Sequence, residues 1–495
     1  MKALQKLAGQ TAIYGLPSII GRLLNYLLVP LHTGKFTTSE YGEIIEMYSY
    51  VAFLVVLLTY GMETAYFRFE SKKDSNHQTI FSTVLISLFS STVLFISFAT
   101  FFANDIATLL KYSDNSEYVI WFAYIVGLDA LSSIPMARLR IENKAIRFAS
   151  VNMANILVNI GLNVFWIGYC MPAHNAGESN FILNTFYSPE IGIGYVFIAN
   201  LFATVVKFLL LTPSLLKVNF TFSKSILKDM FIYGGPLLIA SIAIIINETS
   251  DKILLKWLLL DDLGLYNAKA QVGIYGGVYK LSIIISLFIQ AFRYAAEPFF
   301  FSQEKEKDSK DTYALIMKYF VIICSVIFLT VMLYLDQLKR FVNNEEYWEG
   351  LHIVPILLFA NIFLGIFYNL SVWYKLNGKT KYGAFIAVIG AIITLVLNVI
   401  LIPKIGYTGS AWATLACYGT MAVISYVLGQ KHYKINYSLK SIFFYLGVSF
   451  VFYLASTLLN LPEESLLKFG VNSMILLTFL SMIFVLEKPK KALIS

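Results

Sequence analysis

About fourteen long apolar segments, separated by short polar breaks, constrain the fold of this chain more than any other feature of its sequence. Roughly 20 helical residues span the ~30 Å hydrocarbon core of a bilayer, and each segment has about that length or more. The segments are 11–31, 44–67, 80–103, 118–137, 148–170, 190–212, 231–258, 267–292, 313–335, 351–373, 382–402, 409–430, 441–460 and 468–486. They predict an all-α polytopic membrane protein.

The composition agrees with a membrane protein. Hydrophobic residues make up 58% of the 495 residues and charged residues only 14%, against about 25% charged in soluble proteins. Three cysteines, Cys170, Cys324 and Cys417, lie in or beside apolar segments. An odd number so placed argues against a disulfide framework and against a metal site. We expect no metal and no cofactor.

Basic residues concentrate in every second connection between segments. If the N-terminus is cytoplasmic, the connections that carry most lysines and arginines also face the cytoplasm, as the positive-inside rule requires. The connection that holds Arg138, Arg140, Lys144 and Arg147 is the clearest case. Both termini are therefore predicted to be cytoplasmic. This asymmetry accounts for the net charge of +8 without nucleic-acid binding.

The sequence repeats itself in two halves. The pattern Ile-Tyr-Gly-x-Pro opens the first segment at 13–17 and the seventh at 232–236, and Leu-Asn-Val recurs at 162–164 and 397–399. These matches predict two six-helix lobes in the same orientation, which is a parallel repeat about an axis along the membrane normal. The predicted divisions are 1–225, 226–430, and two additional spans with a cytoplasmic tail in 431–495.

The seventh segment carries polar residues where a spanning helix can least tolerate them. Asn247, Glu248, Asp251 and Lys252 lie within its apolar run, and each charge at such depth costs roughly 2.5–3.5 kcal/mol. Glu248, Asp251 and Lys252 share one helical face. That face either forms an ion pair that locks two helices together or lines a water-filled pathway. The pathway is favoured, because the corresponding first segment carries Arg22.

Most other intramembrane charges fall on the first, second, seventh and eighth segments, which suggests a shared central cavity between the lobes. Cations suit an anionic substrate group such as phosphate. The predicted substrate-binding residues are Arg22, Asn25, Arg68, Lys252, Lys280 and Arg293. Candidates for ion coupling or charge pairing are Glu63, Asn247, Glu248, Asp251 and Glu297, and Pro17 and Pro236 are candidate hinges.

No nucleotide-binding motif is present: Gly378-Lys379-Thr380 lacks the upstream glycine of a P-loop, since position 373 is Trp. Energy for transport would then come from the substrate gradient or from a Na⁺ or H⁺ gradient.

Several motifs together resemble the polysaccharide branch of the multidrug/oligosaccharidyl-lipid/polysaccharide exporter superfamily, the Wzx-type oligosaccharide flippases. They are the Tyr-Gly-x-Pro openings at 14–17 and 233–236, Asn-Glu-x-x-Asp-Lys at 247–252, Ala-Phe-Arg at 291–293 and the stretch 402–414. The resemblance implies a flippase that moves undecaprenyl-pyrophosphate-linked oligosaccharide to the outer leaflet of the bacterial inner membrane by alternating access. It also implies a role in lipopolysaccharide or O-antigen biosynthesis beside other polysaccharide assembly proteins.

Other functions remain open on the sequence. A lipid II flippase and an ion-coupled multidrug antiporter belong to the same superfamily. A membrane polymerase or glycosyltransferase would need catalytic residues in a large outside loop, whereas the longest one here, near 171–189, is short. A scaffold without transport would not need charges on buried helices.

Overall fold

The computed structural model describes residues 20–21, 23–70, 76–215, 221–303, 308–463 and 465–488, apart from the side chains of residues 295, 297, 298, 301 and 302. Within them the chain forms helices and no strand, and 12 helices are long and apolar enough to cross a membrane. One of these, Lys224–Tyr294, covers two of the expected segments. Of the first expected segment, residues 11–19 and 22 lie outside the described residues. The prediction of an all-α polytopic fold with about fourteen spans is confirmed.

The α-helices are α2 (Leu28–Lys35), α3 (Thr38–Thr59), α4 (Met62–Glu70), α5 (His77–Phe101), α6 (Ala103–Leu109), α7 (Ser116–Ile141), α8 (Ala145–Asn163), α9 (Met171–Asn175), α10 (Phe181–Phe186), α11 (Gly194–Leu215), α12 (Lys224–Tyr279), α13 (Ile283–Gln303), α14 (Ser309–Leu333), α15 (Leu335–Leu338), α16 (Val354–Leu370), α17 (Val372–Leu376), α18 (Lys381–Ile405), α19 (Tyr407–His432), α20 (Leu439–Leu458) and α21 (Leu466–Leu486). A π-helix, η1 (Val164–Cys170), continues α8, and 3₁₀ turns occupy η2 (Pro189–Ile191), η3 (Lys280–Ser282), η4 (Lys339–Phe341) and η5 (Glu345–Ile353).

The chain forms two compact units. One contains the residues up to Gly273 together with Ala387–Gly406, and the other contains Ile274–Ile386 and the residues from Tyr407 onward. The division predicted at 225/226 rests on the repetition of sequence motifs. The two compact units do not test that repetition, so the division stays a prediction.

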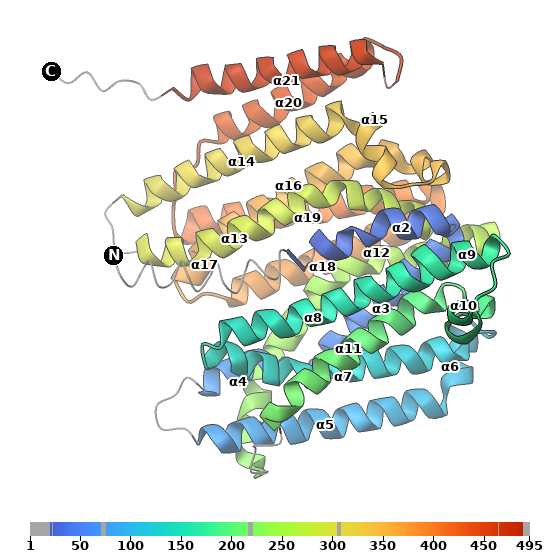
Figure 1. Cartoon of the computed structure of the whole chain (residues 1–495). Helices are drawn as coiled ribbons and strands as arrows, with labels where there is room; N and C mark the ends of the chain where they lie inside the picture. Colours follow the sequence, from blue (N-terminus) through green and yellow to red (C-terminus); the bar gives the residue numbers. More distant parts are fainter. Residues whose placement is uncertain are drawn as a thin grey trace. The chain divides into compact units, whose positions relative to one another are not determined.

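In the first unit, α5, α7, α11 and α8 pack in series (Figure 1). Aromatic rings from three helices meet in its interior, where Phe197 contacts Phe122 at 4.7 Å and Tyr118 at 4.9 Å between centroids, and Tyr48 of α3 adds an edge contact to Phe122. The hydroxyl group of a buried tyrosine also needs a hydrogen-bond partner. Asn200 supplies it by donating to the Tyr48 hydroxyl at 3.0 Å. This packing holds α3 against α7.

Helix α12 is two helices joined across Gly264. This residue has φ 76° and ψ 165°, a conformation that is essentially restricted to glycine. The turn corresponds to the break expected between the seventh and eighth segments. It places Lys256 just before the reversal and Lys269 just after it.

In the second unit, α16 packs along α19, and α14 lies between α16 and α20. Helices α20 and α21 run beside α14 (Figure 1). Glu487, directly after α21, accepts hydrogen bonds from Lys318 of α14 at 2.5 Å and from Tyr445 of α20 at 2.9 Å. Only 11% of the most apolar stretch of α21 is buried within the protein, as expected for a helix that contacts lipid.

Candidate functional site

A completely buried ion pair connects α3 with α12. The Nζ atom of Lys256 lies 2.9 Å from Oε1 of Glu46, and both side chains are 0% exposed. Removing two charges from water costs several kcal/mol per ion, which their attraction offsets only if the remaining donors and acceptors are also satisfied. The surroundings of this pair must therefore supply further hydrogen bonds.

Neighbouring groups supply them. Glu46 Oε1 accepts from the Tyr50 hydroxyl at 3.0 Å, and Oε2 accepts from the Tyr112 hydroxyl at 2.6 Å. Lys256 donates a second hydrogen bond, to the carbonyl oxygen of Leu110 at 2.7 Å. The carboxylate thus has three donors and the ammonium group two acceptors, which is how a buried charge pair can persist in a low-dielectric environment.

A second ion pair lies in the same region. Lys269 donates to Glu43 at 2.7 Å, and both of these side chains are mostly buried. The ring of Tyr112 lies beside both lysines, with its centroid 4.4 Å from Lys256 Nζ and 4.2 Å from Lys269 Nζ. Cation–π attraction strengthens as such groups are desolvated. We call Glu43, Glu46, Tyr112, Lys256 and Lys269 the α3–α12 ion cluster.

Two glycines bring the backbones of α3 and α12 into contact beside this cluster. A Cβ atom on Gly42 would lie 1.9 Å from the carbonyl oxygen of Lys269, and one on Gly273 would lie 1.8 Å from that of Thr38. No side chain fits at either position without moving the helices apart. Small residues permit this close approach in membrane proteins, where apolar surface gains little by leaving lipid.

The other end of α3 also meets α12. The helix ends at Tyr60, which is left-handed with φ 34°, and Gly61 follows with φ 74° against the carbonyl oxygen of Gly234. The Tyr60 ring stacks on Phe231 at 5.3 Å. In α4, the exposed Arg68 places its guanidinium 4.2 Å from the ring centroid of Tyr233. Helices α3 and α4 therefore contact α12 at two levels.

The four polar residues expected to matter in the seventh segment do not share one environment. Asn247 and Asp251 are buried, whereas Glu248 is exposed. Lys252 folds back along its own helix, donating to Asp251 and to the carbonyl oxygen of Glu248 at 2.9 and 2.8 Å. Asn247 instead joins α18, donating to Ala387 O at 3.3 Å and accepting from Thr394 at 3.2 Å.

Asparagines at repeat-related positions are both fully buried. Asn163 of α8 accepts from His32 of α2 at 2.8 Å and donates to Asn159 O at 2.8 Å. Asn398 of α18 donates to Thr394 O at 2.7 Å, and the Thr394 hydroxyl in turn donates to Asn247. Each predicted half thus has polar bonds near its Leu-Asn-Val motif. In the first these bonds reach His32, just beyond the expected first span, and in the second they reach Asn247 in the expected seventh span.

Replacing Asn163 by leucine should lower the free energy of unfolding by about 1 kcal/mol, because the buried His32 loses this acceptor. The thermal midpoint of the purified protein in detergent measures the effect. Asn398→Leu should cause a loss of similar size. Unchanged midpoints in both variants would contradict the structural role assigned to these asparagines.

The remaining predicted residues lie in several places. Glu63 of α4 forms an ion pair with Arg140 of α7, and the exposed Asn25 accepts from Asn159 at 3.4 Å. Lys280 begins η3 and is half-buried. Pro236 lies within a continuous stretch of α12, which departs from helical geometry at Gly264. Pro17, Arg22 and the side chain of Glu297 lie outside the described residues.

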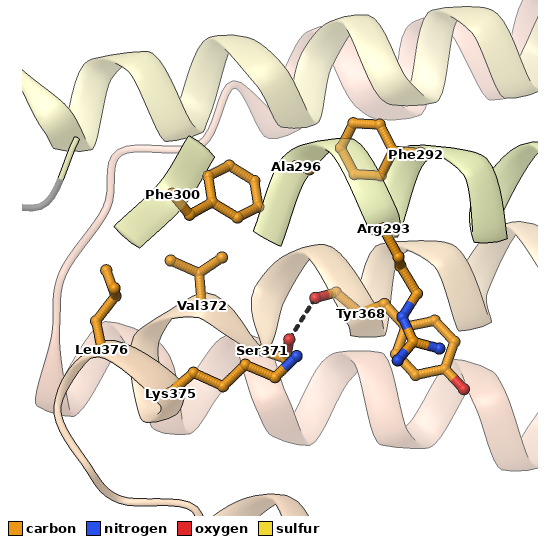
Figure 2. Close-up of a pocket in the computed structure, with 9 residues that line it drawn as sticks. All are labelled: Phe292, Arg293, Ala296, Phe300, Tyr368, Ser371, Val372, Lys375 and Leu376. Carbon is orange, nitrogen blue, oxygen red and sulfur yellow. Dashed lines mark hydrogen bonds between the residues drawn. The ribbon is translucent and has the colours of Figure 1, made fainter. Parts of the chain in front are cut away.

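Arg293 lines a small pocket in the second unit. Figure 2 shows its guanidinium over the ring of Tyr368, 3.9 Å from the centroid, and the side chain of Lys375 reaching toward Ser371. The interior volume of this pocket is only about 10 Å³, roughly what one water molecule needs. Two cations thus line a pocket that must widen before it can take an anionic group. Within the described residues, no group of three His, Cys, Asp or Glu side chains could hold a metal ion.

The α3–α12 ion cluster is not predicted from the sequence. One signal was present: Glu46 lies inside an expected span, and Lys256 lies near the outer end of another. Because 210 residues separate them, nothing in the local pattern pairs them.

Comparisons with known proteins agree with this fold. Residues 7–304 match the family model described as polysaccharide biosynthesis protein. The structure described as "Lipid II flippase MurJ, inward closed conformation" matches with a TM-score of 0.74 and 14% identity, covering 95% of this chain and 98% of that chain. An inward-facing multidrug resistance MATE transporter of the MOP superfamily matches with a TM-score of 0.59 and 16% identity, over 87% of this chain and 94% of that one.

Among curated proteins no sequence matches significantly. The family match covers more than half of the chain and confirms the resemblance drawn from its motifs. The chain belongs to the polysaccharide biosynthesis protein family and has the fold of the transporters of the multidrug/oligosaccharidyl-lipid/polysaccharide exporter superfamily.

Proposed function

We propose that this protein is a flippase that moves an undecaprenyl-pyrophosphate-linked oligosaccharide from the inner to the outer leaflet of the bacterial inner membrane. The product would serve surface polysaccharide synthesis such as that of O-antigen. The family match supports a role in polysaccharide synthesis, and the fold supports transport rather than catalysis.

The α3–α12 ion cluster carries this proposal. Helix α3 belongs to the first predicted half and α12 to the second, and on the predicted topology the cluster lies at the outer side of the membrane. Alternating access needs contacts between halves that can form and break. When this contact opens, Glu46 and Lys256 regain their hydration, which compensates for the lost ion pair. A buried ion pair therefore suits a gate whose two states have similar free energies.

Close backbone packing at Gly42 and Gly273 complements the ion pair. In a bilayer the association of helices depends on packing and polar bonds, since lipid is as apolar as the helices themselves. The glycine contact excludes water when the gate is closed. It leaves no large apolar side chains that would be exposed to water when the gate opens.

The substrate would meet the cations that are predicted from the sequence to line a central cavity. Arg68 is exposed at the end of α4, where a planar guanidinium can bind a phosphate through two hydrogen bonds. Lys252, Lys280 and Arg293 are the other described candidates. Which of them contact the pyrophosphate stays a prediction, as do the cytoplasmic location of both termini and any coupling to Na⁺ or H⁺.

Transport of a fluorescent undecaprenyl-pyrophosphate oligosaccharide in proteoliposomes tests the proposal. Arg68→Ala should reduce the rate about tenfold, the equivalent of one charge-assisted hydrogen bond, and Arg68→Lys should recover only part of it. Lys440→Ala is a matched control, since Lys440 is an exposed cation in the first turn of α20. A wild-type protein that leaves the labelled oligosaccharide in its original leaflet would refute the proposal.

A lipid II flippase is the second candidate, favoured by the match to MurJ over 95% of this chain. The same proteoliposomes loaded with lipid II discriminate between the two. Preference for the peptide-bearing lipid would replace the first proposal with the second. Export of a cationic dye driven by an ion gradient would instead indicate a multidrug antiporter of the same superfamily.

A further inference from the structure

A second cavity lies in the first unit, away from the α3–α12 ion cluster. It has a volume of about 440 Å³ and lies between α5, the start of α12 and the break after α3. This volume falls in the ordinary range of ligand pockets, about 300–1,000 Å³. Its lining residues are Tyr60, Ile86, Ser87, Ser90, Ser91, Leu94, Phe222, Leu227 and Phe231. We call it the α5–α12 crevice.

The walls of the crevice are suited to a hydrocarbon chain. Its surface is mostly apolar, and the stacked rings of Tyr60 and Phe231 form one wall. Two of the serine hydroxyls already have partners: Ser87 bonds to the Tyr60 hydroxyl at 2.7 Å, and Ser91 donates to Leu88 O at 3.1 Å. None of the described lining residues is charged. The crevice therefore offers few hydrogen-bonding or charged groups to a polar ligand.

The crevice also has the depth of one leaflet. From Ile86 to Leu94 the helix rises ~12 Å at 1.5 Å per residue, and half of the hydrocarbon core of a bilayer is about 15 Å thick. The exposed residues Phe89 and Phe98 on the same helix mark the adjoining surface as lipid-facing. The molecules that can enter this cavity from its surroundings are therefore membrane lipids.

Basic residues lie next to the crevice, at the start of α12. The segment before α12 is held to the first turns of α5, where Thr221 N donates to Ser82 at 3.2 Å and Ser223 N donates to Thr83 at 3.1 Å. Helix α12 begins directly afterwards with Lys224, and Lys228 follows one turn later; both are exposed. Asp229 is the one carboxylate in residues 224–229. If a lipid acyl chain lies in the crevice, these two lysines are at the level of the lipid headgroup.

From this arrangement we infer that the α5–α12 crevice binds an anionic phospholipid of the bilayer. One acyl chain lies along α5 from Ile86 to Leu94 against the Tyr60–Phe231 stack. The phosphate lies at Lys224 and Lys228, where each basic residue near the membrane surface attracts anionic lipid. The site does not depend on the transported substrate, so it can be tested whether or not the proposed function holds.

Native mass spectrometry of the purified full chain, titrated with phosphatidylglycerol or phosphatidylcholine of equal chain length, tests the inference. Wild-type protein should retain phosphatidylglycerol about thirtyfold more tightly, since each of the two lysines contributes about 1 kcal/mol. Lys224→Gln/Lys228→Gln should remove that preference without disturbing the packing of the helix. Lys440→Gln, in the first turn of α20, should leave it unchanged.

A second pair of variants tests whether the acyl chain lies in the apolar crevice. Ser91→Trp fills the crevice and should abolish tight retention of either lipid, whereas Phe89→Trp, on an exposed face of the same helix, should not. Equal retention of both lipids by the wild type, or equal effects of the two tryptophan variants, would overturn the inference. Displacement of phosphatidylglycerol by an equimolar amount of undecaprenyl phosphate would also overturn it, assigning the crevice to an isoprenoid tail.

Discussion

Replacing Glu46 by leucine is expected to lower the free energy of unfolding by about 3–5 kcal/mol. The substitution leaves the Lys256 ammonium group, which is 0% exposed, buried without its carboxylate, and an uncompensated buried charge is among the most destabilising changes a protein can suffer. It also removes the acceptor of the Tyr50 and Tyr112 hydroxyls. The thermal midpoint in detergent and the yield of folded protein measure the loss.

The double variant Glu46→Leu/Lys256→Met is the matched control. Apolar residues of similar volume often replace a buried ion pair with no loss of stability, so the midpoint should return close to that of the wild type. Transport should stay low, because the apolar contact gains no hydration when the gate opens. If the single variant proves as stable as the wild type, the assigned burial of this pair is wrong. If the double variant transports normally, the pair is structural and not a gate.

Adding methyl groups at Gly42 and Gly273 is expected to hold α3 and α12 apart and to stop transport. The Cβ atoms would lie 1.9 and 1.8 Å from backbone oxygens, which cannot rotate away as a side chain could. In the Gly42→Ala/Gly273→Ala variant, a cysteine placed at the buried Ala268 should react with a membrane-impermeant maleimide several times faster than in the parent. The proposed gate would then be open to the outer side.

Gly419→Ala provides the control for this prediction. Gly419 lies within α19, where a Cβ atom would meet no other atom within 4 Å. Alanine there should be neutral or slightly stabilising, since it reduces the entropy of the unfolded chain. Normal transport by the Gly42→Ala/Gly273→Ala variant would show that the close approach of the two helices is not needed.

Much of the fold could be predicted because apolar length is a local property. The expected breaks fall close to the observed ones, including the reversal at Gly264 between the seventh and eighth segments. A helix crossing a bilayer satisfies its own backbone hydrogen bonds, so its existence does not depend on distant residues. Short elements such as the π-helix after Asn163 and the break at Tyr60–Gly61 have no such signal, since a few residues of irregular geometry leave the hydropathy unchanged.

The site was harder to predict, because it depends on pairing between distant segments. The hydropathy pattern singles out Asp251 and Lys252, which form an ion pair with each other on one helix. It does not single out Lys256, one turn further along α12, whose partner lies on α3. Hydropathy and helical spacing identify the charges that are costly to bury. They do not identify which of them will be compensated, and by which residue.

The separation of Glu46 from Lys256 has a consequence for biogenesis. The two residues are 210 positions apart, and at the usual synthesis rate of about 5–20 residues per second the lysine follows the glutamate by roughly 10–40 s. If α3 inserted fully during that interval, its carboxylate would enter the membrane uncompensated, at a cost of up to about 2.5–3.5 kcal/mol, the value for a charge at the bilayer centre. Full insertion of α3 should therefore wait for α12. A nascent chain arrested before Lys256 is expected to leave the start of α3 at the aqueous interface, where its carboxylate keeps its water.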